Sequence, residues 1–306
     1  MNQMPDNTTK RQHVVPQFYL RGFADAKGKL HVYDRKERRY FAASPKDLLC
    51  ENMFYETKWE GASPVLGEYV LFNELEYRLS ESESRYCRLM NRIVENCGRI
   101  KRPDTPVCND DELELLAEFI SSLFLRNPKT FQDVEAEYAD RSEMDICKSV
   151  EALFSDADLG SANSLIKHAV KQGILNASIP GSPAFVEKQN LLKMRPLFIQ
   201  TKTIEFITSS NPVVTLGVIS GNTDSGKMIQ VEFFPLSPKM VVMYTNDPTQ
   251  QARTNRLLFA EDELSIWVNR LHLEMSIEQA RFIIANNQAQ LLSFVNSNTA
   301  ASSNVE

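Results

Sequence analysis

The spacing of apolar residues changes character at the turn-rich stretch Ile179-Pro-Gly-Ser-Pro183. In the long block before this stretch, apolar residues recur every three or four positions, which is the period of amphipathic helices. Directly after it, they stand in short runs of β-branched and aromatic residues that are typical of strands. Because the helical and extended patterns occupy separate parts of the chain, the sequence predicts an α+β fold.

The central block is expected to be helical. One helix is predicted over residues 68–97 and a second over residues 110–125. The second helix should begin at Asn109, because an N-cap Asn followed three residues later by Glu112 matches a capping box. Two or three further helices fit within residues 129–173, before the chain reaches the turn-rich stretch.

The C-terminal part is expected to form an antiparallel β-meander followed by two helices. The two helices are predicted at residues 262–273 and 277–285, where apolar side chains recur at helical spacing. Four β-rich runs bounded by Pro, Gly, Asn or Ser are predicted to be the strands. These runs are residues 203–207, 213–219, 229–234 and 240–244.

The N-terminal part is predicted to be a small β-hairpin piece with one short helix. Pro16 suits the first position of a helix over residues 17–21, and Gly22 is placed to end it. Two β-rich stretches at residues 29–33 and 39–42 flank a charged turn. They are expected to pair as a hairpin.

These parts are expected to build one α+β domain over residues 1–296. A length of 306 residues allows one large domain or two smaller ones. The sub-regions are 1–60 with the hairpin and short helix, 61–180 with the helices, and 181–296 with the meander and the last helices. The polar residues 297–306 are predicted to be a frayed tail.

Composition excludes several classes of protein. Gly occurs only 11 times, and no phosphate-binding Gly-rich motif is present. No run approaches the ~18 apolar residues of a membrane span, and the polar start lacks the apolar run of a secretory leader. Five scattered Cys without a C-x-x-C pair are typical of reduced thiols, so we expect a cytoplasmic protein with no membrane partner. With four His and no metal-ligand spacing, neither a metal nor a cofactor is predicted.

Charge is unevenly distributed along the chain, although the net charge is only −6. Residues 1–48 carry ten Lys or Arg against five Asp or Glu, whereas residues 104–160 carry four against fifteen. The basic front end fits an anionic partner such as a nucleic acid or a nucleotide. The acidic block would repel such a partner, or it is simply the solvated face of helices.

The strongest local cluster is the segment His13-Val-Val-Pro-Gln-Phe-Tyr-Leu-Arg-Gly-Phe23. His13, Gln17 and Arg21 recur at four-residue spacing, so on a helical course they lie on one side. An imidazole can transfer protons near pH 7, and a guanidinium can grip phosphate or carboxylate. We therefore regard all three as candidate catalytic residues. The alternative is that His13 caps the short helix and the other two face water.

A second cluster lies where a predicted strand ends, at Ser209, Ser210 and Asn211. Asn211 precedes a proline, which restricts its backbone to extended geometry. Because loops anchored on strands are good platforms for binding groups, these three are candidate substrate-binding residues. The alternative is an ordinary polar turn.

Two carboxylates seven residues apart, Glu76 and Glu83, are predicted to lie near one helical face. They could act as a pair in acid–base chemistry. The alternative is that both are exposed and paired with a nearby arginine, namely Arg78, Arg85 or Arg88.

Four motifs taken in order resemble a bacterial family catalogued only as domain of unknown function 4238. They are the opening H-x-V-P-Q-F-x-L-R-x-F, the stretch Phe-Leu-Arg-Asn-Pro128, the later Phe-Ile-Thr-Ser-x-Asn-Pro-Val and a Pro-Leu-Ser-Pro turn, and together they span about residues 12–290. The resemblance implies that His13, Gln17 and Arg21 belong with Asn211 as a polar signature. It supplies no established reaction.

One position departs from the pattern of that family. The resemblance implies Asp before the Asn-Pro pair, whereas this chain has Ser210. A carboxylate there would orient His13 or bind a metal, and a serine hydroxyl supplies no charge. A metal-dependent mechanism is therefore disfavoured.

Two functions follow as hypotheses. The first is a hydrolase or nuclease-like enzyme on an anionic nucleic acid or nucleotide substrate, acting as a toxin or phage-defence effector. The second is a non-catalytic ligand- or protein-binding sensor whose polar signature is architectural, since buried polar networks also specify folds. A partner protein or a homo-oligomer is compatible with both.

Overall fold

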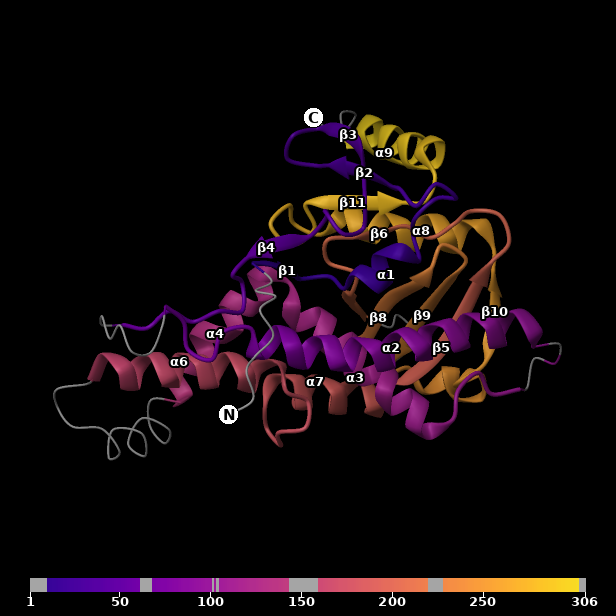
Figure 1. Cartoon of the computed structure of the whole chain (residues 1–306). Coiled ribbons are helices and arrows are strands. Elements are labelled where there is room, and N and C mark those ends of the chain that lie inside the picture. Colours follow the sequence, from indigo (N-terminus) through magenta and orange to yellow (C-terminus); the bar gives the residue numbers. More distant parts are fainter. Residues whose placement is uncertain are drawn as a thin grey trace.

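A five-stranded sheet, a four-stranded sheet, a two-stranded ladder and a group of helices make up the described part of the α+β fold (Figure 1). The computed structural model describes residues 10–60, 68–100, 102, 105–142, 159–219 and 228–302. The main hydrophobic core extends from Val15 near the N-terminus to Ile284 near the C-terminus, and it takes side chains from helices and from both sheets. Distant parts of the chain therefore share one core.

The larger sheet has five strands in the order β10-β5-β9-β8-β7. Strands β7, β8 and β9 form the predicted antiparallel meander. Two strands were not predicted: β5 pairs antiparallel with β9, and β10 pairs parallel with β5, so the sheet is not purely antiparallel. The strands are β5 (Arg195–Thr201), β7 (Val214–Ile219), β8 (Met228–Ser237), β9 (Met240–Thr245) and β10 (Leu257–Ala260).

The smaller sheet has four strands in the order β3-β2-β11-β6. The predicted N-terminal hairpin, β2–β3, is confirmed, and the C-terminal strand β11 pairs along its free edge. A separate two-stranded ladder joins β1 to β4. The strands are β1 (Arg11–His13), β2 (Leu30–Asp34), β3 (Arg39–Ala43), β4 (Cys50–Asn52), β6 (Thr208–Ser209) and β11 (Phe282–Ala285).

Three predictions in the C-terminal part are wrong. Residues 277–285 are not a helix, because β11 occupies Phe282–Ala285 as a central strand with Ile283 and Ile284 fully buried. The predicted strand at residues 203–207 is irregular, and only Thr208–Ser209 pairs as β6. The expected frayed tail begins too early, because helix α9 (Gln288–Ser302) continues past residue 297. Residues 303–306 lie outside the described part.

The helices lie mainly on one side of the larger sheet (Figure 1). Helix α3 begins at the predicted capping box, in which Asn109 and Glu112 satisfy each other's backbone N–H groups. The short helix α1 is held by Tyr19, whose hydroxyl contacts Thr208 in β6 and donates to the Pro235 carbonyl in β8. The helices are α1 (Gln17–Arg21), α2 (Glu74–Arg99), α3 (Asp110–Arg126), α4 (Pro128–Ser142), α6 (Leu159–Leu175), α7 (Pro183–Lys193), α8 (Asp262–Glu274) and α9.

A buried carboxylate locks the hairpin to β11. Asp34, only 1% exposed, accepts hydrogen bonds from Arg281 and from the backbone N–H groups of Lys36 and Glu37. The Arg281 guanidinium and these N–H groups hold the pKa of Asp34 below its ordinary value. The negative charge of Asp34 is thus built into the folded state.

Asp34→Asn should lower the free energy of unfolding by about 1–3 kcal/mol at neutral pH, because it leaves Arg281 without its charged partner. A carboxyl with a lowered folded-state pKa stabilises above its unfolded pKa, and that contribution disappears as the pH falls through the lowered value. Urea unfolding at neutral and acid pH should therefore show a deficit that shrinks in acid. Glu37→Gln, which removes a carboxylate 4.0 Å from Arg281, is the matched control and should change little. A deficit independent of pH would contradict this role of Asp34.

Among the described residues, no helix has the length and apolar character needed to cross a membrane.

Candidate functional site

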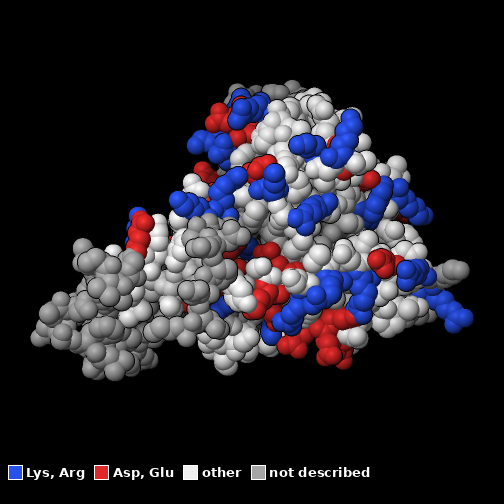
Figure 2. Space-filling view, in the orientation of Figure 1, with Lys and Arg blue, Asp and Glu red and all other residues white. Residues whose placement is uncertain are grey.

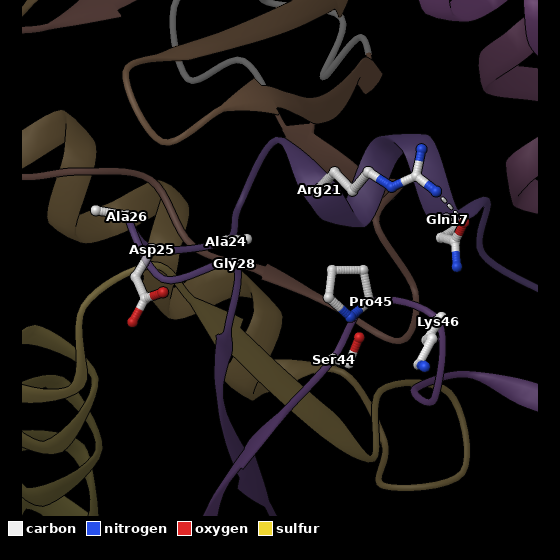
Figure 3. Close-up of a pocket in the computed structure, with 9 residues that line it drawn as sticks. All are labelled: Gln17, Arg21, Ala24, Asp25, Ala26, Gly28, Ser44, Pro45 and Lys46. Atoms are coloured by element: carbon white, nitrogen blue, oxygen red, sulfur yellow. Dashed lines mark hydrogen bonds between the residues drawn. The ribbon is translucent and has the colours of Figure 1, made fainter.

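An open pocket of about 490 Å³ lies between α1 and the segment that follows β3 (Figure 3). Gln17 and Arg21 line its α1 side, and the Gln17 side-chain oxygen accepts a hydrogen bond from the Arg21 guanidinium. Lys46 lines the opposite side. The pocket thus joins two candidate residues to a cation that was not singled out from the sequence.

The surroundings of the pocket are positively charged. Arg21 and Lys46 line it, and Lys27 and Lys29 follow lining residues in the chain. All four are exposed, and within the described ranges none is in ion-pair distance of a carboxylate. Asp25, an acidic residue of the pocket lining, accepts hydrogen bonds from the backbone N–H groups of Lys27 and Lys29. The bond from Lys29 contributes most to lowering the pKa of Asp25. The unpaired cations favour an anionic ligand.

The wider surface has the same character. Figure 2 shows Lys and Arg side chains, with fewer Asp and Glu side chains among them, over the upper part of the molecule, where Figure 1 places α1 and the β2–β3 hairpin. Two more exposed cations, Lys36 and Arg38, lie in the hairpin turn. The basic balance of residues 1–48 therefore becomes a basic surface.

His13 does not continue the helix that carries Gln17 and Arg21. The prediction that the three side chains lie on one side of a helix is therefore wrong for His13. It lies in β1, and α1 begins only after Pro16, which has the extended backbone of an N-cap. His13 does not cap that helix either, since no side chain caps its first turn. The ring is half-buried, with Nε2 3.1 Å from the Sγ atom of Cys50.

Burial is the main influence on the pKa of His13 and lowers it; Glu83 partly opposes this, and Arg126 adds to it. The imidazole is therefore mostly neutral at pH 7 and can accept a proton. The backbone carbonyl of Lys46 also acts on the ring, and the Sγ atom of Cys50 lies 3.5 Å from that carbonyl oxygen. Lys46 thus has its main chain beside His13 and its side chain in the pocket.

A fully enclosed arginine holds the backbone of His13. Arg126, 2% exposed, donates to the Tyr55 hydroxyl at 2.9 Å, to Glu83 at 2.7 Å and to the carbonyl oxygen of His13. The Phe-Leu-Arg-Asn-Pro motif is therefore joined directly to the opening motif. The contact uses the main chain of His13, so the imidazole remains available.

Glu76 and Glu83 lie near the same arginine, and the alternative pairing with Arg78, Arg85 or Arg88 is wrong for Glu83. Arg78 pairs with Glu74 and Arg85 with Glu118, whereas Glu83 pairs with Arg126. Burial raises the pKa of Glu76 to about 7, with Arg126 opposing the rise and Glu83 adding to it. Near neutral pH, Glu76 can therefore either hold or release a proton.

The second candidate cluster is in the interior. Ser209 is fully buried and Asn211 is 4% exposed. The Ser209 hydroxyl donates to the Asn211 carbonyl at 2.7 Å and lies 3.1 Å from Nδ1 of His272. His272 is also fully buried, and burial lowers its pKa to about 3. The Ser209 hydroxyl thus contacts the Asn211 main chain and the His272 ring, the Asn211 amide contacts Met275, and none of these residues lines the pocket.

Ser210 contacts the β11 backbone. Its hydroxyl accepts a hydrogen bond from the Phe282 N–H at 3.2 Å, and its own N–H donates to the Phe282 carbonyl. The residue at this position is thus aimed at β11. The missing family carboxylate would stand beside that strand and not beside His13.

The two clusters have different partners. The partners of His13 include Cys50 in β4, Tyr55 and Arg126 in α3, whereas the Asn211 amide donates to Met275, just after α8. The nearest chain neighbours of the two clusters do meet, since the Tyr19 hydroxyl of α1 is hydrogen-bonded to Thr208 of β6. Within the described residues, no group of three or more His, Cys, Asp or Glu side chains could hold a metal ion.

Sequence patterns missed three residues around His13. Cys50 had no motif, and only its pairing opposite His13 in the β1–β4 ladder brings the two together. Lys46 was one cation among many in the basic front end. Arg126 belongs to the Phe-Leu-Arg-Asn-Pro motif, and this motif was the one sequence signal that pointed to it.

Comparison with known proteins adds the family. No curated protein and no solved structure matches the chain. A family model described as "Protein of unknown function (DUF4238)" matches residues 11–289, which contain every candidate residue discussed above. Because the family model matches most of the chain, including the opening motif that suggested the relationship, the protein belongs to the DUF4238 family.

Proposed function

We propose that the protein is a hydrolase of phosphate esters, with a nucleotide or a nucleic acid as its anionic substrate. The observation that carries the proposal is the position of Lys46. Its side chain lines the cationic pocket with Arg21, and its backbone carbonyl faces the half-buried His13. His13 does not itself line the pocket, and Lys46 is the residue that connects the pocket to this proton acceptor.

Each residue has a distinct role in this proposal. Arg21 and Lys46 bind phosphate oxygens through charge-assisted hydrogen bonds, and Gln17 orients the Arg21 guanidinium. Neutral His13 takes the proton of the attacking nucleophile and returns a proton to the leaving oxygen as the P–O bond breaks. Arg126 fixes the backbone of His13. Ser209, Ser210 and Asn211 serve the interior contacts described above and have no substrate role here.

The proposed setting is the bacterial cytoplasm, with a toxin or phage-defence role as the biological context. Cys50, Cys87, Cys97 and Cys108 are free thiols, which is compatible with a reducing compartment. Cys147 lies outside the described residues. Cleavage of nucleic acid would connect the basic surface to such a role.

Arg21→Ala and Lys46→Ala should each weaken the binding of a fluorescent single-stranded RNA or DNA oligonucleotide by about tenfold or more, because each removes a charge-assisted hydrogen bond. Fluorescence anisotropy at two salt concentrations measures the loss, and the wild-type affinity should fall with salt. Release of phosphate or of shortened oligonucleotides, followed in the same samples, tests the hydrolysis. Lys193→Ala, an exposed lysine at the end of α7, is the matched control. Equal affinities of all three variants would contradict the assignment of the pocket.

The architectural function has its own supporting observation, the enclosure of Arg126, Ser209 and Asn211. In that case the signature holds the N-terminal segment in place, and the imidazole of His13 matters for stability alone. Substitution of His13, described in the Discussion, distinguishes the two functions.

A further inference from the structure

The thiol of Cys50 lies within hydrogen-bond distance of the His13 ring. Nε2 of His13 and Sγ of Cys50 are 3.1 Å apart. The two residues are directly opposite in the antiparallel ladder of β1 and β4, so their side chains leave the same face of that ladder. Both are half-buried, which leaves the pair in reach of a ligand.

We propose that Cys50 is the nucleophile of the phosphate-ester hydrolysis, and that His13 is the base that activates it. This inference rests on the proposed function. A nucleophile within hydrogen-bond distance of a base is the geometric signature of covalent catalysis. The thiol also lies 3.5 Å from the carbonyl oxygen of Lys46, a residue that lines the cationic pocket.

The charges around the thiol explain why it needs a base. Burial raises the pKa of Cys50; Asp47, Glu76 and Glu51 raise it further, and Arg11 acts in the opposite direction. The resting thiol is therefore protonated at neutral pH, and no preformed thiolate is available. Neutral His13 can take the proton during attack, as a base does for a serine nucleophile.

The reaction then has two balanced steps. In the first, the Cys50 proton moves to His13, an S–P bond forms, the ester P–O bond breaks, and protonated His13 returns the proton to the departing alcohol. In the second, water gives a proton to His13 while its oxygen attacks phosphorus. The S–P bond breaks, and the proton on His13 restores the thiol. The products are an alcohol and a phosphate, with no oxidant or metal required.

Alkylation tests the pair without any substrate, and the chain supplies an internal control. Cys87 on α2 is also free and half-buried, and its thiol accepts a hydrogen bond from Asn91 and has no His partner in the described structure. Iodoacetamide labelling at pH 7, read peptide by peptide by mass spectrometry, gives the rates of both thiols. His13→Gln should slow labelling of Cys50 by about tenfold or more and leave that of Cys87 unchanged. An unchanged or faster Cys50 rate in His13→Gln overturns the proposal.

Turnover tests the covalent step. With a chromogenic aryl phosphate as probe, Cys50→Ala and Cys50→Ser should lose activity, Cys87→Ala should keep it, and rapid quenching should find one phosphoryl group on the Cys50 peptide. If wild type and Cys50→Ala hydrolyse the probe equally while His13→Gln does not, Cys50 is not the nucleophile and the proposed function survives. If wild type hydrolyses neither this probe nor a nucleotide or oligonucleotide, the proposed function fails and the nucleophile proposal fails with it.

Discussion

Replacing Arg126 with methionine is expected to lower the free energy of unfolding by about 3–5 kcal/mol, which is the usual cost of removing one member of a buried ion pair. The change leaves Glu83 without its cation and removes the Arg126 donor from the Tyr55 hydroxyl and from the His13 carbonyl, which keeps the 3.3 Å hydrogen bond from Tyr55. A loss this large would be a substantial fraction of the stability of an ordinary domain. Chemical unfolding with urea, followed by circular dichroism, measures it.

Arg78→Met is the control for this experiment. Arg78 also pairs with a glutamate on α2, but its side chain is 49% exposed and its partner Glu74 keeps contacts to His168 and Gln172. Its loss should cost less than about 0.5 kcal/mol. If Arg126→Met costs no more than Arg78→Met, the network does not hold the N-terminal segment in place.

Replacing His13 with glutamine should lower kcat by about 10²–10⁴-fold, because a positioned histidine contributes that much through proton transfer. Stability should change little, since Arg126 contacts the backbone oxygen of residue 13, which glutamine retains. Phosphate release and the melting temperature, measured on the same preparation, separate the two effects. The His168→Gln variant is the control: it replaces a buried histidine outside the site, so the protein should keep its activity.

The pH profile gives a second measure of the same group. Because burial lowers the pKa of His13 from 6.5, the acid limb of kcat/KM should have its midpoint below pH 6.5 and disappear in His13→Gln. A variant that keeps its activity but unfolds about 1–3 kcal/mol more easily would support the architectural function instead.

Local patterns predicted the elements whose burial has a simple period. The helix of residues 110–125 was correctly predicted because its buried side chains and its capping box are both local signals. Residues 282–285 were not, because a short apolar run fits a strand or a helix equally well from its spacing. Pairing with β2 from the other end of the chain decides that it is a strand.

The candidate site divides in the same way. Gln17 and Arg21 meet because they are one helical turn apart, and this spacing can be read from the sequence. His13 and Cys50 meet through strand register, and Arg126 reaches His13 across 113 residues. No local spacing encodes either contact, so the partners of His13 could be found only from the fold.

Strand β11 also has a consequence for how a cell makes this protein. The hairpin of the smaller sheet leaves the ribosome early, but Arg281 and Asp34, which join the hairpin to β11, are 247 residues apart. At rates of synthesis of about 5–20 residues per second, that interval is on the order of ten to fifty seconds. During this time the nascent hairpin exposes an unpaired strand edge, which is the kind of surface that chaperones protect. The pocket beside the hairpin is therefore expected to be finished only near the end of translation, so an active product would not be released before its last strand is made.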